Sequence, residues 1–304
     1  MSTMLVNLPR EKWFRILELH QWEGFWYLFP HLEATLASQS HFQACDDDVL
    51  LASSMKTGTT WLKALIPCIM HSISDDDKDP LIMNHPNALM PSLEVQLYRG
   101  NPSPDLSSIP SPRLLRTHLP YAALPESIKT SNCKIVYITR NPKDTLISLW
   151  HFMNNSKPPG VDAVSLEVAF KSFCNGVHAF GPFFDHVLDY WKQSLDNPQK
   201  ILFMKFEEMK SDPKGQVKKL AAFLGKPFAN DDEEVEKVLW RCSLERLKNL
   251  EVNKTGIDPC IGVPNSSYFR QGIVGDWKNY FTQEMSKELD EITRNRLGDS
   301  GLEF

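Results

Sequence analysis

The chain has 304 residues, of which 42% are hydrophobic and 23% charged, as is usual for a globular protein of one or two domains. Its net charge of −5 excludes a general basic field for nucleic acid or acidic membranes, and no apolar run approaches the length of a membrane span. The six cysteines include no C-x-x-C pair, and the N-terminus lacks the apolar segment of a signal peptide. We therefore expect reduced thiols, no metal site and a cytoplasmic protein.

Residues 1–45 are rich in aromatic side chains without a regular period: Trp13, Phe14, Trp22, Phe25, Trp26, Tyr27 and Phe29. A solvent-exposed tail would not carry so many large apolar groups. We expect the segment to be irregular and to pack on the domain, with the lining of a ligand pocket as the alternative. Residues 1–304 are then expected to form a single domain.

A strand followed by an anion-binding turn is predicted at residues 50–61. The apolar start of this stretch is typical of a buried parallel strand, and helical spacing resumes at Trp61. Between them, Gly58 allows a close approach of the backbone, and the free amides of the helix start favour an anion. Lys56 precedes Gly58, whereas a Walker A motif has its lysine after the glycine. The alternative is a plain turn with a solvated lysine.

The next elements lead to a second clear strand. Residues 75–79 are acidic and are expected to form a solvated loop, a helix is predicted near residues 91–98, and residues 100–112 are a Pro/Ser-rich connection. Strands are predicted at residues 113–118 and 134–139, and the second is rich in β-branched residues. Asn141 and Pro142 then begin a helix.

The second half alternates in the same way. Helices are predicted at residues 165–177, 183–191, 213–224, 233–242 and 282–297, with a strand at 201–206 and a long, lid-like loop at 253–267. Alternating strands and helices with near-continuous apolar strands predict an α/β fold. Its sheet is central, mostly parallel and flanked by helices on both faces.

Three polar side chains, Lys56, His118 and Arg140, follow the carboxyl ends of predicted strands, the edge where open α/β sheets bind ligands. Arg140 and Arg270 offer guanidinium groups for a second phosphate, so a nucleotide phosphorylated at two places is indicated. Each arginine could instead form a surface ion pair. His118, with an ordinary pKa of about 6.5, can accept a proton at neutral pH, and a structural histidine is the alternative.

Four spaced segments carry a family resemblance. They are Lys56-Thr57-Gly58-Thr59-Thr60-Trp61, Arg116-Thr117-His118-Leu119-Pro120, Arg140-Asn141-Pro142-Lys143-Asp144, and Arg270-Gln271-Gly272 followed by Gly275-Asp276-Trp277-Lys278. In this order and at this spacing the chain resembles the cytosolic sulfotransferases. Gly24-Phe25-Trp26 and the ending Gly301-Leu302-Glu303-Phe304 are similar to the plant branch.

The resemblance implies a transferase that moves the sulfuryl group of 3′-phosphoadenosine 5′-phosphosulfate (PAPS) to a hydroxyl of a small molecule. The product is 3′-phosphoadenosine 5′-phosphate (PAP), and no metal takes part. By resemblance, His118 removes the acceptor proton, Lys56 neutralises the leaving oxygen, and Arg116 balances charge on the transferring group. The implied donor-binding residues are Lys56, Thr57, Gly58, Thr59 and Thr60 at the 5′-phosphosulfate, Trp61 and Phe206 near the nucleotide, and Arg140, Ser148, Arg270, Gln271 and Gly272 at the 3′-phosphate.

Several positions depart from the family pattern. Where the family usually has proline, tyrosine, phenylalanine and lysine, this chain has Met55, Phe206, Leu244 and Gln271, respectively. Since a hydrogen bond to a charged group contributes about 1.5–3 kcal/mol, we predict weaker PAPS affinity than is typical. A non-catalytic or weakly active PAPS- or PAP-binding relative is the main alternative, and a P-loop kinase the weaker one.

The resemblance leaves the acceptor open. A flavonoid or other phenol of plant secondary metabolism suits the many aromatic residues, and steroids, hydroxyjasmonates and desulfoglucosinolates are further options. Neither a nucleic acid nor a membrane is expected as a partner. The dimer pattern of animal members is kept only partly, at Lys278 and Thr282, so a monomer is favoured over a homodimer.

Overall fold

A four-stranded parallel sheet forms the centre of the computed structural model, which describes residues 5, 7–71, 79–229 and 232–304. Its strands are β4 (Val49–Ser53), β5 (Leu114–Thr117), β6 (Lys134–Thr139) and β7 (Ile201–Lys205), in the order β5-β4-β6-β7. All three neighbouring pairs are parallel, with Ala52 beside both Thr117 and Tyr137. The carboxyl ends therefore share one edge, as the sequence predicted.

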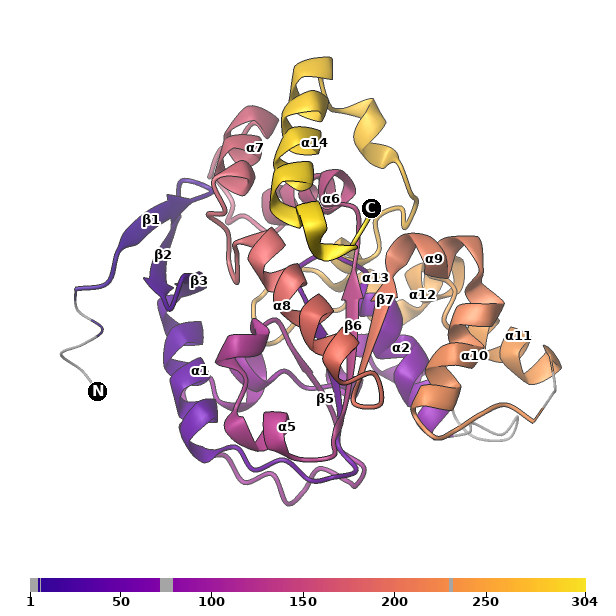
Figure 1. The fold of residues 1–304 in the computed structure, drawn as a ribbon. Helices are drawn as coiled ribbons and strands as arrows, with labels where there is room; N and C mark the ends of the chain where they lie inside the picture. Colours follow the sequence, from indigo (N-terminus) through magenta and orange to yellow (C-terminus); the bar gives the residue numbers. More distant parts are fainter. Residues whose placement is uncertain (1–4, 6, 72–78, 230–231) are drawn as a thin grey trace.

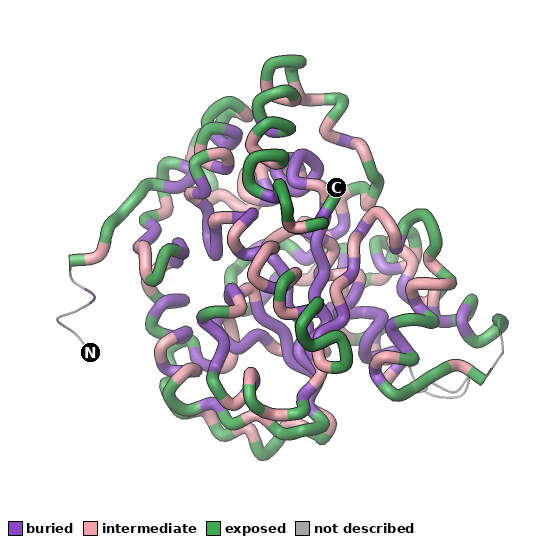
Figure 2. Tube along the Cα trace, viewed as in Figure 1, coloured by how far each residue is buried: buried purple, intermediate pink, exposed green. Residues whose placement is uncertain are grey.

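Helices cover both faces of this sheet (Figure 1). Successive residues of β4 enter opposite cores: Leu50 and Ala52 belong to one apolar cluster, Val49 and Leu51 to the other. This is the period of two that a strand buried on both faces requires. Figure 2 shows the result as a buried sheet inside a shell of partly exposed helices. The expected single-domain α/β class is confirmed.

One face is covered by α6 (Pro142–Asn155), α8 (Phe183–Asp196) and α14 (Gln283–Leu297), and the other by α2 (Thr59–Met70), α10 (Pro213–Phe223) and α11 (Asp232–Arg241). The shorter helices are α3 (Pro80–Met83), α4 (Pro86–Leu89), α5 (Glu126–Thr130), α7 (Leu166–Cys174), α9 (Phe206–Ser211), α12 (Leu244–Asn249) and α13 (Glu251–Thr255). No helix within the described ranges could cross a membrane.

The N-terminal segment corrects one prediction, because it is regular. It forms an antiparallel sheet of β1 (Arg10–Trp13), β2 (Leu17–Trp22) and β3 (Phe25–Leu28), followed by α1 (Phe29–His41). Because both faces of this sheet carry aromatic residues, the sequence shows no alternation of apolar and polar residues. Gly24 (φ +84°), at the turn between β2 and β3, was the sequence feature that could have indicated a hairpin. In this sheet Trp13 and Tyr27 are buried, in the apolar cluster that also contains Leu50 and Ala52 of β4.

Three further predictions change in detail. The helix near 91–98 is a π-helix, η1 (Leu93–Leu97). The loop predicted at 253–267 overlaps α13 (Glu251–Thr255) at its start and a 3₁₀ turn, η3 (Asn265–Tyr268), at its end. Of the acidic run, residues 75–78 lie outside the described residues. Asp79 is not solvated, because its carboxylate caps α3 and pairs with Arg246 at 2.6 Å.

Candidate active site

A pocket of about 490 Å³ opens at the carboxyl edge of the sheet. It brings together eleven of the residues proposed from the sequence: Lys56, Gly58, Thr59, Thr60, Trp61, Arg116, His118, Arg140, Ser148, Phe206 and Gly272. Three others, Thr57, Arg270 and Gln271, are not part of its lining. Segments far apart in sequence thus meet in one cavity.

The turn between β4 and α2, residues 54–60, packs closely against neighbouring side chains. Gly58 has φ +115°, and a Cβ there would lie 2.9 Å from Ile138 Cδ1 and from Phe206 Cδ2. The Thr57 hydroxyl donates to the carbonyls of Ser54 (2.9 Å) and Ile138 (3.0 Å), so it ties the turn to β6 instead of facing the cavity. Any contact of Thr57 with an anion would use its backbone N–H.

Lys56 enters the pocket from this turn with a left-handed backbone (φ +66°). Its ammonium lies 4.0 Å from the ring centroid of Phe152 and 5.6 Å from that of Tyr268. Burial, followed by the charges of Arg140 and Arg270, lowers the pKa of Lys56 to about 7. Since these effects penalise the ammonium, an anion placed beside it would restore the charge.

His118 has one ring nitrogen anchored and one free. Nδ1 lies 2.9 Å from the carbonyl oxygen of Ser53, which can only accept, so Nδ1 carries the proton. No residue of the described chain hydrogen-bonds Nε2, which therefore offers a lone pair to the pocket. Burial, followed by the charge of Arg116, lowers the pKa of His118 to about 3. The ring is therefore neutral at physiological pH, and its Nε2 lone pair is open to a proton, although burial also makes it a weaker base than a solvated imidazole.

A buried network that sequence reasoning missed fixes the backbone of His118. Glu94 accepts from the His118 N–H and from the Thr117 hydroxyl, both at 2.8 Å. His186 Nε2 donates to the His118 carbonyl at 3.0 Å, and its Nδ1 lies 2.9 Å from the Tyr137 hydroxyl. These residues come from four elements with no local motif, so only the fold reveals them.

The residues expected to form a second phosphate clamp are brought only partly together. Arg140 lies 4.5 Å from the Phe206 ring centroid, donates to the Ile273 carbonyl at 2.6 Å and pairs with Asp144 at 3.5 Å. Its Nε is buried without a partner in the described chain. Arg270 pairs with Asp276 at 2.6 Å, but this is not the surface ion pair that the sequence left open, because Asp276 is buried and Arg270 is only partly exposed.

The adenine-side residues are close together. Trp61 packs edge-on against Phe206, with ring centroids 6.0 Å apart. A Cβ on Gly272 would lie 2.8 Å from Leu244 Cδ2, so this glycine is needed where the chain passes Leu244. The Gln271 side chain is exposed.

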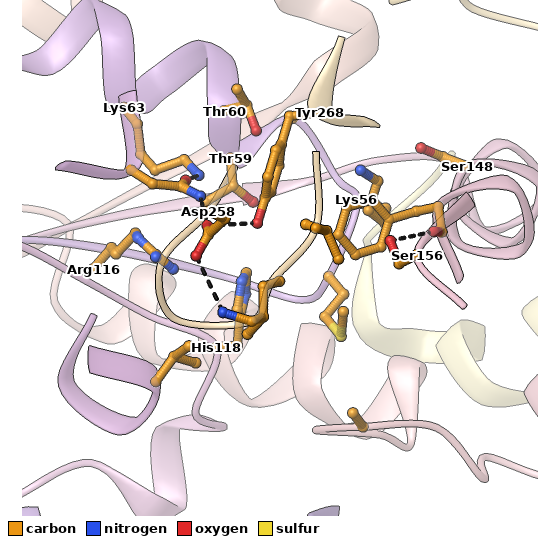
Figure 3. Close-up of a pocket in the computed structure, with 18 of the residues that line it drawn as sticks. Lys56, Thr59, Thr60, Lys63, Arg116, His118, Ser148, Ser156, Asp258 and Tyr268 are labelled. Carbon is orange, nitrogen blue, oxygen red and sulfur yellow. Dashed lines mark hydrogen bonds between the residues drawn. The ribbon is translucent and has the colours of Figure 1, made fainter. Parts of the chain in front are cut away.

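Two buried cations stand on the other side of the pocket (Figure 3). Arg116 donates from Nε to the Met90 carbonyl (3.0 Å) and from Nη2 to Gln96 (3.1 Å). Lys63, on α2 one turn after Thr59, donates to the Asn87 side-chain oxygen. Lys63 was not singled out by the sequence, and its place four residues after a loop threonine was the one available hint.

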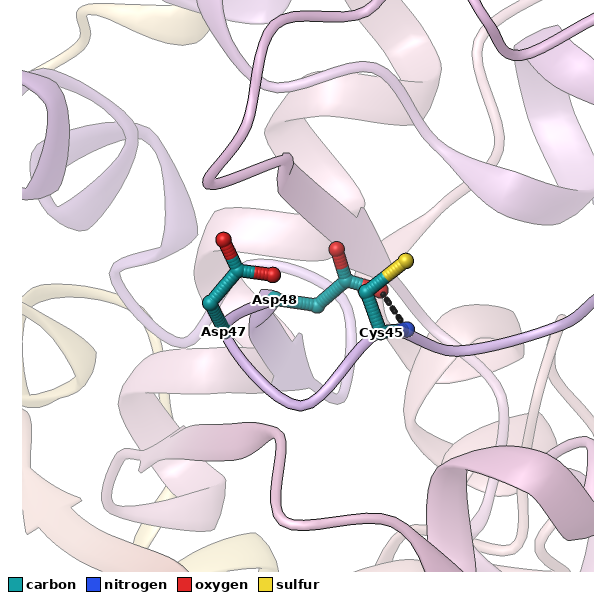
Figure 4. A group of neighbouring side chains, drawn as sticks. All are labelled: Cys45, Asp47 and Asp48. Carbon is teal, nitrogen blue, oxygen red and sulfur yellow. Dashed lines mark hydrogen bonds between the residues drawn. The ribbon is translucent and has the colours of Figure 1, made fainter.

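One group outside the pocket has the composition of a metal site. The ligand atoms of Cys45, Asp47 and Asp48 lie within 4.8 Å of one another (Figure 4). Asp48, however, accepts from Arg113 Nε and from the Cys45 N–H, both at 2.8 Å. Its carboxylate is used to hold the start of β4, so the group is explained by structure.

The chain is similar to known proteins over its whole length. The Sulfotransferase domain family matches residues 46–301. Cytosolic sulfotransferases 5 and 6 of Arabidopsis thaliana are 46% and 45% identical, over 100% of this chain and 96% and 94% of theirs. Among solved structures, a putative steroid sulphotransferase of Arabidopsis thaliana has a TM-score of 0.79 and 35% identity, covering 100% of this chain and 95% of that chain. Mouse sulfotransferase SULT7A1 complexed with PAP has a TM-score of 0.73 and 31% identity, covering 93% and 95%.

Proposed function

Because this chain belongs to the sulfotransferase family, we propose that it moves the sulfuryl group of PAPS to a hydroxyl of a small metabolite. His118 is the general base, and Lys56 stabilises the leaving group. The observation that carries the proposal is the His118 ring, neutral and with a free Nε2 in the same pocket as the Lys56 ammonium.

The residues at the donor end suit PAPS. The start of α2 has no side-chain cap, so its first amides, at the pocket-lining Thr59 and Thr60, are available to a phosphate. The unpartnered Nε of Arg140 lies where Ser148 and Gly272 also line the cavity, which supports a 3′-phosphate site. Trp61 lines the pocket and can stack on adenine. Arg270 would have to leave or share Asp276 to join this clamp.

The chemistry follows from the placement of charge. As the acceptor oxygen forms its bond to sulfur, its proton passes to His118 Nε2 and the sulfur–oxygen bond to PAP breaks. The negative charge that develops on the leaving oxygen is balanced by Lys56, and that on the sulfuryl oxygens by Arg116. Sulfuryl transfer resembles phosphoryl transfer, where positioning and electrostatics supply most of the catalysis. Lys56 and Arg116 can neutralise the developing negative charge, as the metal ion does in kinases.

The alternative of a non-catalytic PAP-binding relative is favoured by one observation, the exposed Gln271 in the 3′-phosphate segment. The enzyme proposal gains from the intact His118 network. By analogy with the relatives, we also propose a cytosolic location, and from the partly kept dimer pattern at Lys278 and Thr282 we propose a monomer. A phenol such as a flavonoid remains one acceptor that the aromatic lining can hold.

The test is transfer of labelled sulfate from PAPS to a panel of phenols, alcohols and hydroxy acids, alongside calorimetric binding of PAP. Turnover that disappears in His118→Ala while PAP still binds supports the proposal. If PAP binds and wild type turns over no better than His118→Ala on any acceptor, the chain is the non-catalytic relative. If PAP does not bind, the donor assignment is wrong.

A further inference from the structure

The basic residues of the pocket outnumber its acids. Its lining contains Lys56, Lys63, Arg99, Arg116, Arg140 and Lys210, against the single carboxylate of Asp258 among the described residues. The protein as a whole carries a net charge of −5, so this local excess of positive charge is a specific feature. A local excess of one sign in a low-dielectric cavity raises the concentration of ligands of the other sign.

These cations fall into two groups on either side of Tyr268. Arg140 and Lys210 contact the donor-side aromatics, with Lys210 5.8 Å from the Trp61 ring centroid. Lys56 and Lys63 lie 5.6 and 5.4 Å from the Tyr268 ring centroid, on opposite sides of it in Figure 3. Lys63 thus lies on the same side of Tyr268 as Arg116 in this view, opposite Lys56.

Asp258 is already saturated with donors. Its carboxylate accepts from the Asn87 amide (2.6 Å), the Tyr268 hydroxyl (2.8 Å) and the N–H groups of Cys260 (2.8 Å) and Ile261 (3.3 Å). Four donors fill the lone-pair positions of a carboxylate, so Asp258 cannot also bind a ligand ammonium. Its role is to hold the loop that covers this side of the pocket.

Lys63, in contrast, has unused capacity. An ammonium has three hydrogens, and Asn87 is the one acceptor that the described residues provide. The side chain is 3% exposed, and burial, followed by the charges of Arg116 and Lys56, lowers the pKa of Lys63 well below its usual range. A buried cation with free donors and like-charged neighbours is stabilised by an incoming anion. The sulfuryl group already has Lys56 and Arg116, so the anion for Lys63 must come from the acceptor.

We propose, resting on the sulfotransferase activity above, that the acceptor is a hydroxylated carboxylic acid. Its hydroxyl lies at His118 Nε2 and its carboxylate at the Lys63 ammonium. Arg99 stands exposed at the rim, donating to the Cys260 carbonyl, and attracts the acid to the opening. The carboxylate is a recognition group and takes no part in bond making.

The experiment compares hydroxy acids with their methyl esters, which keep the skeleton and lose the charge. Suitable pairs are 4-hydroxyphenylacetate, 3-(4-hydroxyphenyl)propanoate and 12-hydroxydodecanoate with their esters. Because a hydrogen bond to a charged group is strong, we expect kcat/KM to be at least about tenfold higher for the best acid than for its ester. In Lys63→Met the ratio should fall to about one, through loss of activity on the acid.

Lys210→Met is the matched control, because it removes the same charge from the donor end of the same pocket. It should leave the acid-to-ester ratio unchanged. Arg99→Met, at an exposed position where folding is not at risk, should lower kcat/KM for the acid severalfold and weaken its salt dependence. Phenylacetate, which has no hydroxyl, should bind the PAP-loaded wild type in calorimetry and lose that binding in Lys63→Met.

The inference is overturned if esters and neutral phenols are used as well as acids, although the proposed function would then stand. It is also overturned if Lys63→Met lowers acid and ester turnover equally, since Lys63 would then serve the transferring group or the fold. Failure of phenylacetate to bind the PAP-loaded protein counts against it independently of turnover. Absence of PAP binding would instead remove the sulfotransferase proposal on which it rests.

Discussion

The two ends of the pocket are built in different ways. The donor end is dominated by one continuous stretch, β4, the turn 54–60 and the start of α2, with Lys56 and Gly58 a few residues apart. The acceptor end is assembled from separate segments: the N-terminal strands, η1, residues 179–180 and the loop that carries Asp258. A local motif therefore specifies one end, whereas only long-range packing specifies the other.

The two ends also bind their ligands through different groups, backbone at one end and side chains at the other. At the proposed donor end, backbone amides and the conformation of Gly58 bind the anion. Substitutions that alter this backbone should therefore weaken donor binding. Side chains such as Lys63, Asn87 and Asp258 define the proposed acceptor end, and none of them belongs to the loop 54–60. Substitutions should accordingly separate donor binding from acceptor turnover.

The largest effect is expected from His118→Ala. Removing the general base should lower kcat by about 10²–10⁴-fold, while PAP affinity stays within about twofold because His118 holds no part of the donor. Steady-state kinetics and calorimetry measure the two quantities. Equal loss of both would mean that the two ends of the pocket are not independent.

Lys56→Met should lower kcat about 10²–10³-fold, since the charge on the leaving oxygen would lose its partner.

In the wild-type protein, the affinity for the donor should depend on pH. The pKa of Lys56 is about 7 in the free protein, and an anion raises it. Above pH 7 the free lysine is neutral, so binding must take up a proton and weakens as pH rises.

Calorimetry at pH 8, in two buffers of different ionisation enthalpy, should show uptake of close to one proton per PAP. Lys56→Arg stays charged and should show none. Proton uptake that persists in Lys56→Arg would assign the titration to another group.

Glu94→Gln tests the positioning of His118. The amide can accept only one of the two hydrogen bonds, so we expect kcat to fall about tenfold, the equivalent of one lost hydrogen bond to a charged group. The acceptor KM and PAP affinity should change little. A fall in thermal stability with kcat unchanged would make Glu94 a structural residue only.

Gly58→Ala should destabilise the protein and remove donor binding. The left-handed backbone and the 2.9 Å approaches to Ile138 and Phe206 together should lower the free energy of unfolding by about 2–4 kcal/mol. Gly225→Ala is the control, with φ +72° and no atom within 4 Å of the added Cβ. Gly225→Ala should lower the free energy of unfolding by about 1–2 kcal/mol and leave PAP affinity unchanged. Chemical denaturation compares the two.

The smallest effect is expected from Gln271→Lys. The sequence alone suggested that the missing lysine weakens PAPS binding by the worth of a charge-assisted hydrogen bond. The side chain is exposed, however, and exposed ion pairs contribute about 0.2–1 kcal/mol. PAP affinity should therefore rise only about two- to fivefold. No change at all would mean that position 271 plays no part in the clamp.

The sequence by itself determined the strand–turn–helix at residues 49–70, the parallel sheet and the edge at which Lys56, His118 and Arg140 meet. These follow from hydrophobic period, turn residues and the direction of parallel strands, which are local properties. Tertiary structure alone decided the regular N-terminal sheet, the inward turn of the Thr57 hydroxyl, the Glu94 and His186 clamp and the place of Lys63. The N-terminal sheet had Gly24 as its local signal and Lys63 had its spacing from Thr59, whereas the other two depend on contacts between residues distant in sequence.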